Sequence, residues 1–60
     1  MTTFKLEIAV GDAPFVNDRS YQIGRCLQQV TAMLQMDDRS EGPVRDGNGN
    51  QVGVFWFEED

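Results

Sequence analysis

The chain has no histidine and a single cysteine among its 60 residues. Histidine is the usual general base and the commonest metal ligand, so its absence removes the residue on which most acid–base and metal sites depend. Cys26 has no imidazole partner and falls among apolar residues at helical spacing, which favours a small core residue over a nucleophile. We therefore expect no catalytic residue, no metal site and no cofactor, and a protein that is not an enzyme.

Basic residues are also scarce. Five lysines and arginines stand against ten aspartates and glutamates, which gives a net charge of −5. Direct nucleic-acid binding needs a basic face that neutralises phosphates, so we do not expect it here. Taken alone, the negative charge has two interpretations: it keeps a small protein in solution, or it matches the basic surface of a protein partner.

Long apolar runs are missing as well. None approaches the roughly 18 residues of a membrane span, and no signal peptide opens the sequence, so we expect no membrane association and a cytoplasmic location. One cysteine excludes an internal disulfide and is typical of a reducing compartment. A domain of this size lies at the lower limit for independent folding, which makes a partner or a second copy an expected source of stability.

What is present is clear hydrophobic periodicity. Alternation with period two predicts a strand over residues 3–10, with Phe4, Leu6, Ile8 and Val10 on one face. Helical spacing predicts a helix over residues 17–36 that begins at Asn17 or Asp18, both common N-cap residues. Its apolar stripe consists of Ile23, Cys26, Leu27, Val30, Met33 and Leu34. Gly24, which is unfavourable inside a helix, is interpreted as a point where the helix backbone approaches the sheet.

Two more strands are predicted, over residues 43–46 and 51–58. They flank Asp46-Gly47-Asn48-Gly49-Asn50, a strong hairpin signal because these residues accept positive φ easily. Residues 1–60 therefore form a single α+β domain of βαββ order. We expect one helix on a three-stranded antiparallel sheet with strand order 1-3-2, the most apolar strand being central.

The hairpin loop shares some features with calcium-binding and phosphate-binding loops, but it matches neither. Its oxygen-bearing residues match positions one, three and five of a calcium loop, but Gln51 replaces the glycine at position six and Phe57 replaces the glutamate at position twelve. A phosphate loop requires a helix after its glycines, and here a strand follows. The turn interpretation therefore stands.

The last strand is apolar on both faces. Alternation places Val52, Val54 and Trp56 on one face of the strand. Gly53, Phe55 and Phe57 lie on the other face. The pattern does not decide which of the two sets faces the helix. Because one helix covers one face, we expect Phe55 and Phe57 to form an exposed aromatic patch that binds a partner. The rim of that patch would carry Lys5, Glu7 and Arg45.

The run Gly42-Pro43-Val44-Arg45-Asp46, followed by Asn48-Gly49-Asn50 and Val52-Gly53, resembles the ending of short uncharacterised bacterial and phage open reading frames. The likeness extends over nearly the whole chain and identifies no catalytic residue. It implies a phage or prophage origin and a location in the host cytoplasm. By analogy of size and charge, it also implies an inhibitor that binds and blocks a host nucleic-acid enzyme such as a CRISPR effector.

The leading hypothesis is thus a non-enzymatic acidic protein-binding module, in its narrower form a phage-encoded, anti-CRISPR-like inhibitor. The partner is expected to be a protein with a basic surface. The alternative is a small homo-oligomeric structural or accessory protein, such as a homodimer, assembled through the aromatic sheet face. The expected partner-binding residues are Asp37, Asp38, Glu41, Phe55, Phe57, Glu58, Glu59 and Asp60.

Overall fold

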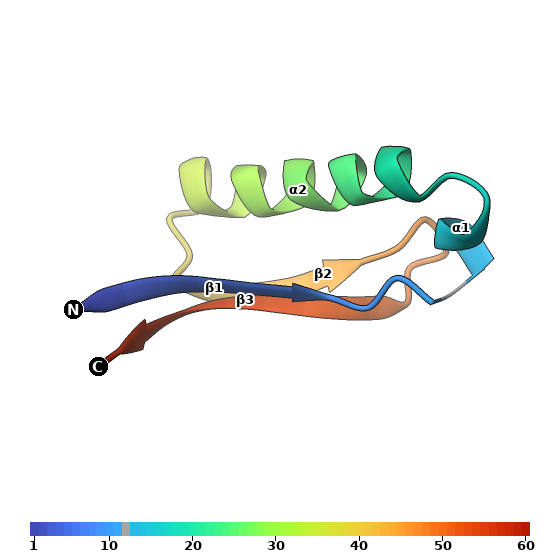
Figure 1. Ribbon diagram of the computed structural model, residues 1–60. Coiled ribbons are helices and arrows are strands. Elements are labelled where there is room, and N and C mark those ends of the chain that lie inside the picture. Colours follow the sequence, from blue (N-terminus) through green and yellow to red (C-terminus); the bar gives the residue numbers. More distant parts are fainter. Residues whose placement is uncertain (12) are drawn as a thin grey trace.

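A computed structural model describes residues 1–11 and 13–60; Asp12, in the predicted turn after the first strand, lies outside the described residues. The domain has two layers, with one long helix lying across one face of a three-stranded sheet (Figure 1). Along the chain the elements are β1 (Thr2–Ile8), α1 (Ala13–Val16), α2 (Arg19–Gln35), β2 (Glu41–Arg45) and β3 (Gln51–Glu59).

The sheet has the strand order β1-β3-β2, and both neighbouring pairs are antiparallel. This confirms the predicted α+β class, the βαββ order and the central position of the last strand. A return over the sheet by the helix leaves β1 and β2 parallel to each other, so β3 can pair with both only by running between them in the opposite direction. The one addition is α1, a single helical turn where a connection was expected.

The element bounds differ from the predicted ones by a few residues. β1 ends at Ile8 instead of at residue 10, and α2 begins at Arg19 after Asp18, whose side chain makes no capping hydrogen bond. β2 begins two residues earlier than predicted, at Glu41. β3 extends one residue further, to Glu59. Such shifts are usual at element ends, where hydrogen bonding and not hydrophobic pattern sets the limit.

A β-bulge near the start of β3 changes the face of one residue. Val44 pairs with Gly53 and Arg45 pairs with Gln51, so Val52 is the extra residue on β3. The bulge turns Val52 into the core, although alternation groups it with Val54 and Trp56. The prediction that these three valine and tryptophan side chains share one face is wrong for Val52.

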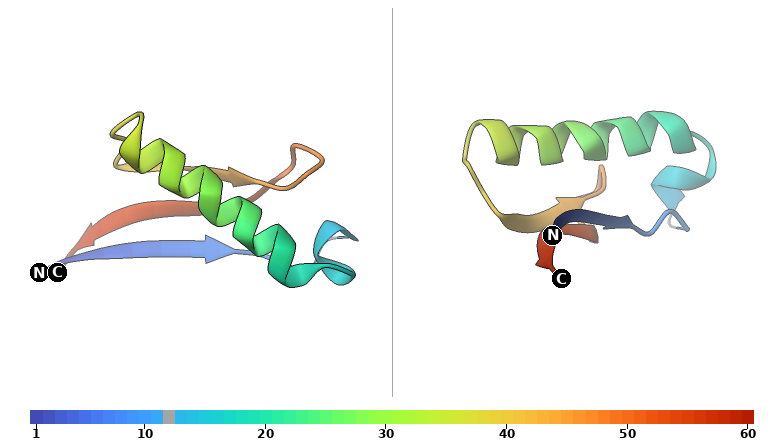
Figure 2. Two further views of the ribbon diagram at one scale, coloured as in Figure 1. Left: turned by 90° about the horizontal axis from the view of Figure 1, so that it is seen from above. Right: turned by 60° about the vertical axis from the view of Figure 1, so that its left-hand side comes forward.

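The core lies between α2 and the sheet and is closed at one end by α1. Its buried members are Phe15, Cys26, Val30, Val44, Val52 and Phe55. Leu27, predicted as part of the buried stripe, is 45% exposed. The helix crosses the sheet diagonally, from beyond the outer edge of β1 to a position over β2 (Figure 2). Cys26 and Val30 are the fully buried residues of the helix, and Ile23, Met33 and Leu34 are partly buried against the core. The diagonal crossing leaves Leu27 at the margin of this stripe.

Close backbone approach is made by a different glycine from the one predicted. A Cβ atom at Gly24 would have no neighbour within 4 Å, so the interpretation of Gly24 as a packing glycine is wrong. A Cβ atom at Gly53 would overlap the carbonyl oxygen of Glu7 and lie 3.1 Å from the Cα atom of Ile8. The pairing of β1 with β3 therefore depends on glycine at position 53.

Candidate partner-binding surface

Six of the eight predicted partner-binding residues lie together at one end of the domain. The connection from α2 to β2, the start of β2 and the end of β3 meet there, beside the start of β1 (Figure 1). All six side chains are exposed. We call this region the acidic end; it comprises Asp37, Asp38, Glu41, Glu58, Glu59 and Asp60.

Few cations neutralise the acidic end. The Glu58 carboxylate lies 3.9 Å from the Lys5 ammonium, and this is the only ion pair within residues 1–11 and 13–60. Glu59 accepts a hydrogen bond from the Thr2 hydroxyl, and Trp56 Nε1 lies 3.5 Å from Glu58 Oε1. The carboxylates at this end thus produce a local negative potential available to a ligand.

The end of α2 fixes two of these acids outside the helix, as predicted. Asp38 has φ of 51°, in the left-handed region, and the backbone N–H of Arg39 donates to the carbonyl of Met33 at 3.0 Å. The left-handed residue turns the chain away from the helix axis, and the Arg39 N–H supplies a partner for one of the last helical carbonyls. Asp37 and Asp38 consequently lie past the helix, where they oppose its dipole least.

The predicted exposure of Phe55 is wrong. Its side chain is 0% exposed and lies beneath α2, with its ring centroid 6.0 Å from that of Phe4. Phe57, on the same face, is 46% exposed at the margin and packs edge-on against Phe4 at 5.4 Å. The set that contains Phe55 and Phe57 is the one that faces the helix, so Phe55 is a core residue in this structure.

The uncovered face of the sheet carries the other set. Val54 and Trp56 lie there, paired across the sheet with Glu7 and Lys5 of β1. We call this the open sheet face. It includes a shallow hollow of about 510 Å³ that is lined by Glu7, Ser40, Glu41, Val54, Trp56 and Phe57. Two carboxylates at the margin of an apolar, aromatic floor suit a cationic side chain with an apolar stem.

Val54 and Trp56 were not predicted as partner-binding residues, although the period-two pattern had already separated them from Phe55. The sequence does not give the register of β3 with β1. That register decides which side chains of the two strands lie on the same face of the sheet. Lys5 and Glu7 were predicted to rim the Phe55 and Phe57 patch, and this is wrong: they lie on the opposite, open sheet face, beside Trp56 and Val54. Arg45 does not serve as a rim residue, because its guanidinium donates to the Gly49 carbonyl in the hairpin loop at 3.1 Å.

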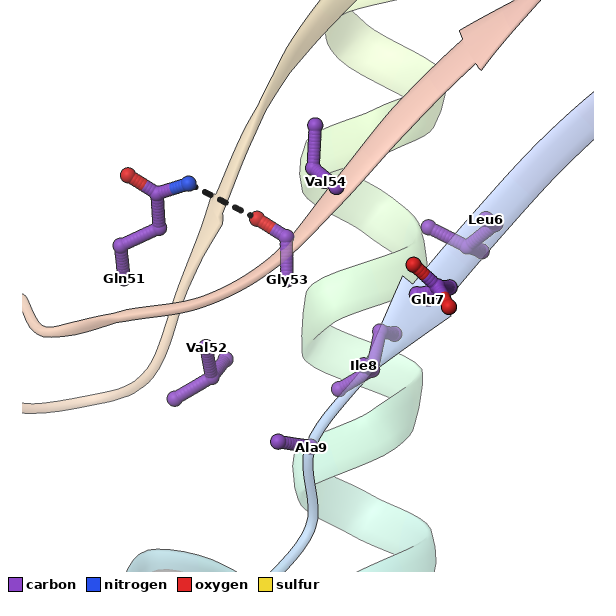
Figure 3. Close-up of a pocket in the computed structure, with 8 residues that line it drawn as sticks. All are labelled: Leu6, Glu7, Ile8, Ala9, Gln51, Val52, Gly53 and Val54. Carbon is purple, nitrogen blue, oxygen red and sulfur yellow. Dashed lines mark hydrogen bonds between the residues drawn. The ribbon is translucent and has the colours of Figure 1, made fainter.

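A second hollow, of about 780 Å³, lies over the end of β1 and the start of β3 (Figure 3). Its lining is Leu6, Glu7, Ile8, Ala9, Gln51, Val52, Gly53 and Val54. Gly53 contributes no side chain, and the Gln51 amide folds back onto the Gly53 carbonyl at 3.3 Å. Glu7 is the one ionisable residue of the lining, so this hollow offers no pair of groups for acid–base chemistry.

The hairpin loop uses its aspartate internally. Asp46 is buried, and its Oδ1 accepts hydrogen bonds from the backbone N–H groups of Asn48 at 2.8 Å and Asn50 at 2.9 Å. Gly49 adopts φ of 83°, which the turn requires and glycine accepts. Among the described residues, no group of three or more aspartate, glutamate or cysteine side chains is placed to hold a metal ion.

The single thiol is shielded from solvent. Cys26 is buried, with its Sγ atom 3.9 Å from the carbonyl oxygen of Arg45. Burial raises the pKa of the Cys26 thiol; the nearby Asp46 carboxylate raises it further and Arg25 opposes both. A raised pKa keeps the sulfur protonated near neutral pH, and a protonated thiol is a poor nucleophile.

Comparison of the chain with protein-family models, with curated proteins and with solved structures finds no match. None of the described helices combines the length and hydropathy of a membrane-spanning segment. The functional proposal therefore depends on the charge and geometry of the acidic end and the open sheet face.

Proposed function

We propose that this domain is a non-enzymatic protein-binding module whose ligand is a basic segment of a partner protein. The observation that carries the proposal is the continuity of the acidic end with the Trp56 hollow. Glu41 belongs to both, because it pairs with Trp56 across the sheet. Shape and charge thus favour the same class of ligand.

A lysine or arginine side chain of the partner has a specific place on this surface. Its methylene stem packs on Val54 and the Trp56 ring, and its charged group lies near the carboxylates of Glu7 and Glu41. An arginine should bind here more tightly than a lysine, because its planar guanidinium can stack on an indole and bond a carboxylate at the same time. Further cations of the same segment then meet the acidic end.

The narrower form of the proposal is a phage-encoded inhibitor that acts in the host cytoplasm on a nucleic-acid enzyme such as a CRISPR effector. Enzymes that hold nucleic acid present a basic channel to the phosphates. An acidic end of exposed carboxylates competes for such a channel, and its long-range field raises the association rate at low salt.

The test is comparative capture from a bacterial lysate with three immobilised chains. The first is the wild type, and the second is Asp37→Asn/Asp38→Asn, which removes two charges from the acidic end without changing side-chain size. The third is Asp18→Asn/Gln28→Lys, a matched control that shifts the net charge by the same amount at two exposed positions away from that end. Captured proteins are quantified by mass spectrometry.

The proposal predicts proteins that the wild type and the control capture and the acidic-end variant loses. Their capture should fall when the salt concentration rises from about 0.1 M to about 1 M, because the Debye screening length then shortens from about 10 Å to about 3 Å. Displacement by added DNA or RNA is expected for the narrower form. Equal capture by all three chains, or capture that survives high salt, would contradict a charge-based partner.

A further inference from the structure

The two outer strands of the sheet differ in how their edges are protected. On β2, the side-chain amide of Gln29 bonds both the N–H and the C=O of Arg45, the groups that point away from β3. Outward-pointing residues alternate along a strand, so Pro43 is the next one, and proline has no N–H to offer. The β2 edge is therefore blocked to further strand pairing at Pro43 and Arg45, two of its three outward-pointing residues.

The β1 edge has no such protection. Met1 accepts a hydrogen bond from Asp60, and Ala9 donates one to Val52, so odd-numbered residues of this segment bond toward β3. Thr2, Phe4, Leu6 and Ile8 then direct their N–H and C=O groups outward. Within the described part of the chain, no hydrogen bond reaches these outward groups. β1 also lacks proline and a bulge.

Apolar surface is left uncovered beside the same edge. Phe4 is 42% exposed and Phe57 is 46% exposed, although both lie on the helix side of the sheet. The diagonal course of α2 explains this, because its last turns lie over β2 and its first turns lie beyond β1 (Figure 2). Near the start of β1, the helix side of the sheet is thus not covered by α2. Near the end of β1, α2 extends past the outer edge of the sheet.

We infer that a second copy of this chain pairs with β1, antiparallel, about a two-fold axis at Leu6. Leu6 then forms a hydrogen-bonded pair with Leu6 of the other copy, and Phe4 forms one with Ile8. All of these residues are outward-bonding, so the hydrogen-bond pattern of the edge is satisfied. The result is a continuous six-stranded sheet with both helices on one face.

Charge selects this register from its neighbours. With the axis at Leu6, Lys5 of each copy lies opposite Glu7 of the other, so that two opposite-charge pairs form on the open sheet face. With the axis at residue 5, two lysines would oppose each other. With the axis at residue 7, two glutamates would do so. Like charges directly opposite destabilise a strand pair, so both neighbouring registers are disfavoured.

The shape of the domain fits the same axis. The first turns of α2 extend beyond β1 at the end where β1 stops (Figure 2). Pairing Ile8 with Phe4 brings this end of each copy next to the start of β1 of the other copy, where Phe4 and Phe57 are partly exposed. The first turns of each α2 are thereby brought towards the apolar surface that the other copy leaves exposed. The antiparallel arrangement also leaves the two acidic ends free, at opposite ends of the joint sheet. The inference does not depend on the identity of a basic partner.

A charge-swap experiment tests the dimer. Lys5→Glu and Glu7→Lys each place like charges opposite each other in both pairs, and each should raise the dimer dissociation constant by about tenfold or more. A mixture of these two variants restores opposite charges in both pairs, as does the double variant Lys5→Glu/Glu7→Lys, so both should recover wild-type association. Sedimentation equilibrium measures all four samples. The Lys5–Glu58 ion pair, which is exposed, contributes little to folding and is checked by circular dichroism.

Amide exchange gives a second, position-specific measurement on the wild type. The N–H groups of Phe4, Leu6 and Ile8 should become protected as concentration rises, whereas those of Lys5 and Glu7 are protected at every concentration because they bond to β3. A chain that stays monomeric up to about 1 mM would overturn the inference. So would a dimer that the charge swaps leave unchanged, or one whose Leu6 amide exchanges as fast as in the monomer.

Discussion

The side-chain amide of Gln29 forms two hydrogen bonds with the backbone of Arg45, in the way a neighbouring strand would. Nε2 donates to the carbonyl at 2.6 Å, and Oε1 accepts from the N–H at 3.0 Å. The contact joins α2 to the outer edge of β2 near the hairpin. It supplies partners for backbone groups that would otherwise have to be met by water or by another chain.

Gln29→Ala should lower the free energy of unfolding by about 1–2 kcal/mol, because it removes both hydrogen bonds at once. Urea unfolding followed by circular dichroism measures the change. Gln28→Ala is the matched control, since Gln28 is exposed on the same helix, and it should stay within about 0.5 kcal/mol of the wild type. Equal losses at both positions would show that the Arg45 contact is not a stabilising one.

Two glycine substitutions should have opposite effects. Gly24→Ala adds a methyl group into open space in a helix and should raise the free energy of unfolding by about 0.8–1 kcal/mol. Gly53→Ala pushes the same group into the backbone of β1, which cannot move aside as a side chain can, and should lower it by about 2–3 kcal/mol. Denaturant midpoints decide the matter. If Gly53→Ala stabilised the domain as Gly24→Ala is expected to do, the close pairing of β1 with β3 would be contradicted.

Asp38→Gly should stabilise the domain by about 0.5–1 kcal/mol. Glycine accepts the left-handed conformation at this position without the strain that a side chain brings, and the substitution also removes an acid near the helix C-terminus. Asp38→Ala is the control, because it removes the same charge but retains the strain. Thermal unfolding should rank glycine above aspartate. Equal gains from glycine and alanine would assign the effect to charge alone.

Stability should fall at alkaline pH because of Cys26. Its folded-state pKa is raised above the ordinary value of 9.0 by burial, with Asp46 adding to the effect, so the folded state keeps a proton that the unfolded state loses. The contribution is fully present below the unfolded pKa and is lost as pH rises through it towards the folded pKa. Cys26→Ala removes this dependence. Urea unfolding at about pH 7 and about pH 10 compares the two chains, and an unchanged slope in Cys26→Ala would contradict the assignment.

Much of the fold could be predicted from periodicity, since alternation in residues 3–10 and helical spacing after Asp18 are strong local signals. The strand order followed from one helix and one hairpin. The faces of β3 could not be predicted, because they depend on its register with β1 and on the bulge at Val52. A register is a property of two segments far apart in the sequence, and a bulge adds a residue without a marked local pattern.

The candidate partner-binding surface, too, could be predicted from the sequence only in part. The acidic residues were predicted, and their meeting at one end follows from the chain order, since α2 ends where β2 begins and β3 returns beside β1. Trp56 could not be chosen over Phe55 without knowledge of the buried face. The contact of Gln29 with Arg45 joins two polar residues 16 apart in the sequence, and neither carries a signal that points to the other.

The blocked edge of β2 also limits how many further strands the sheet can add. In the language of polymer chemistry, a sheet protein with two open edges is a bifunctional monomer, and its association propagates into fibres. Pro43 and Gln29 make this chain monofunctional: one strand can be added at β1, and growth then terminates. Under the inferred pairing at β1, this small domain with an apolar central strand should stay a discrete dimer at high concentration, because the one addition consumes the site at which the next would start.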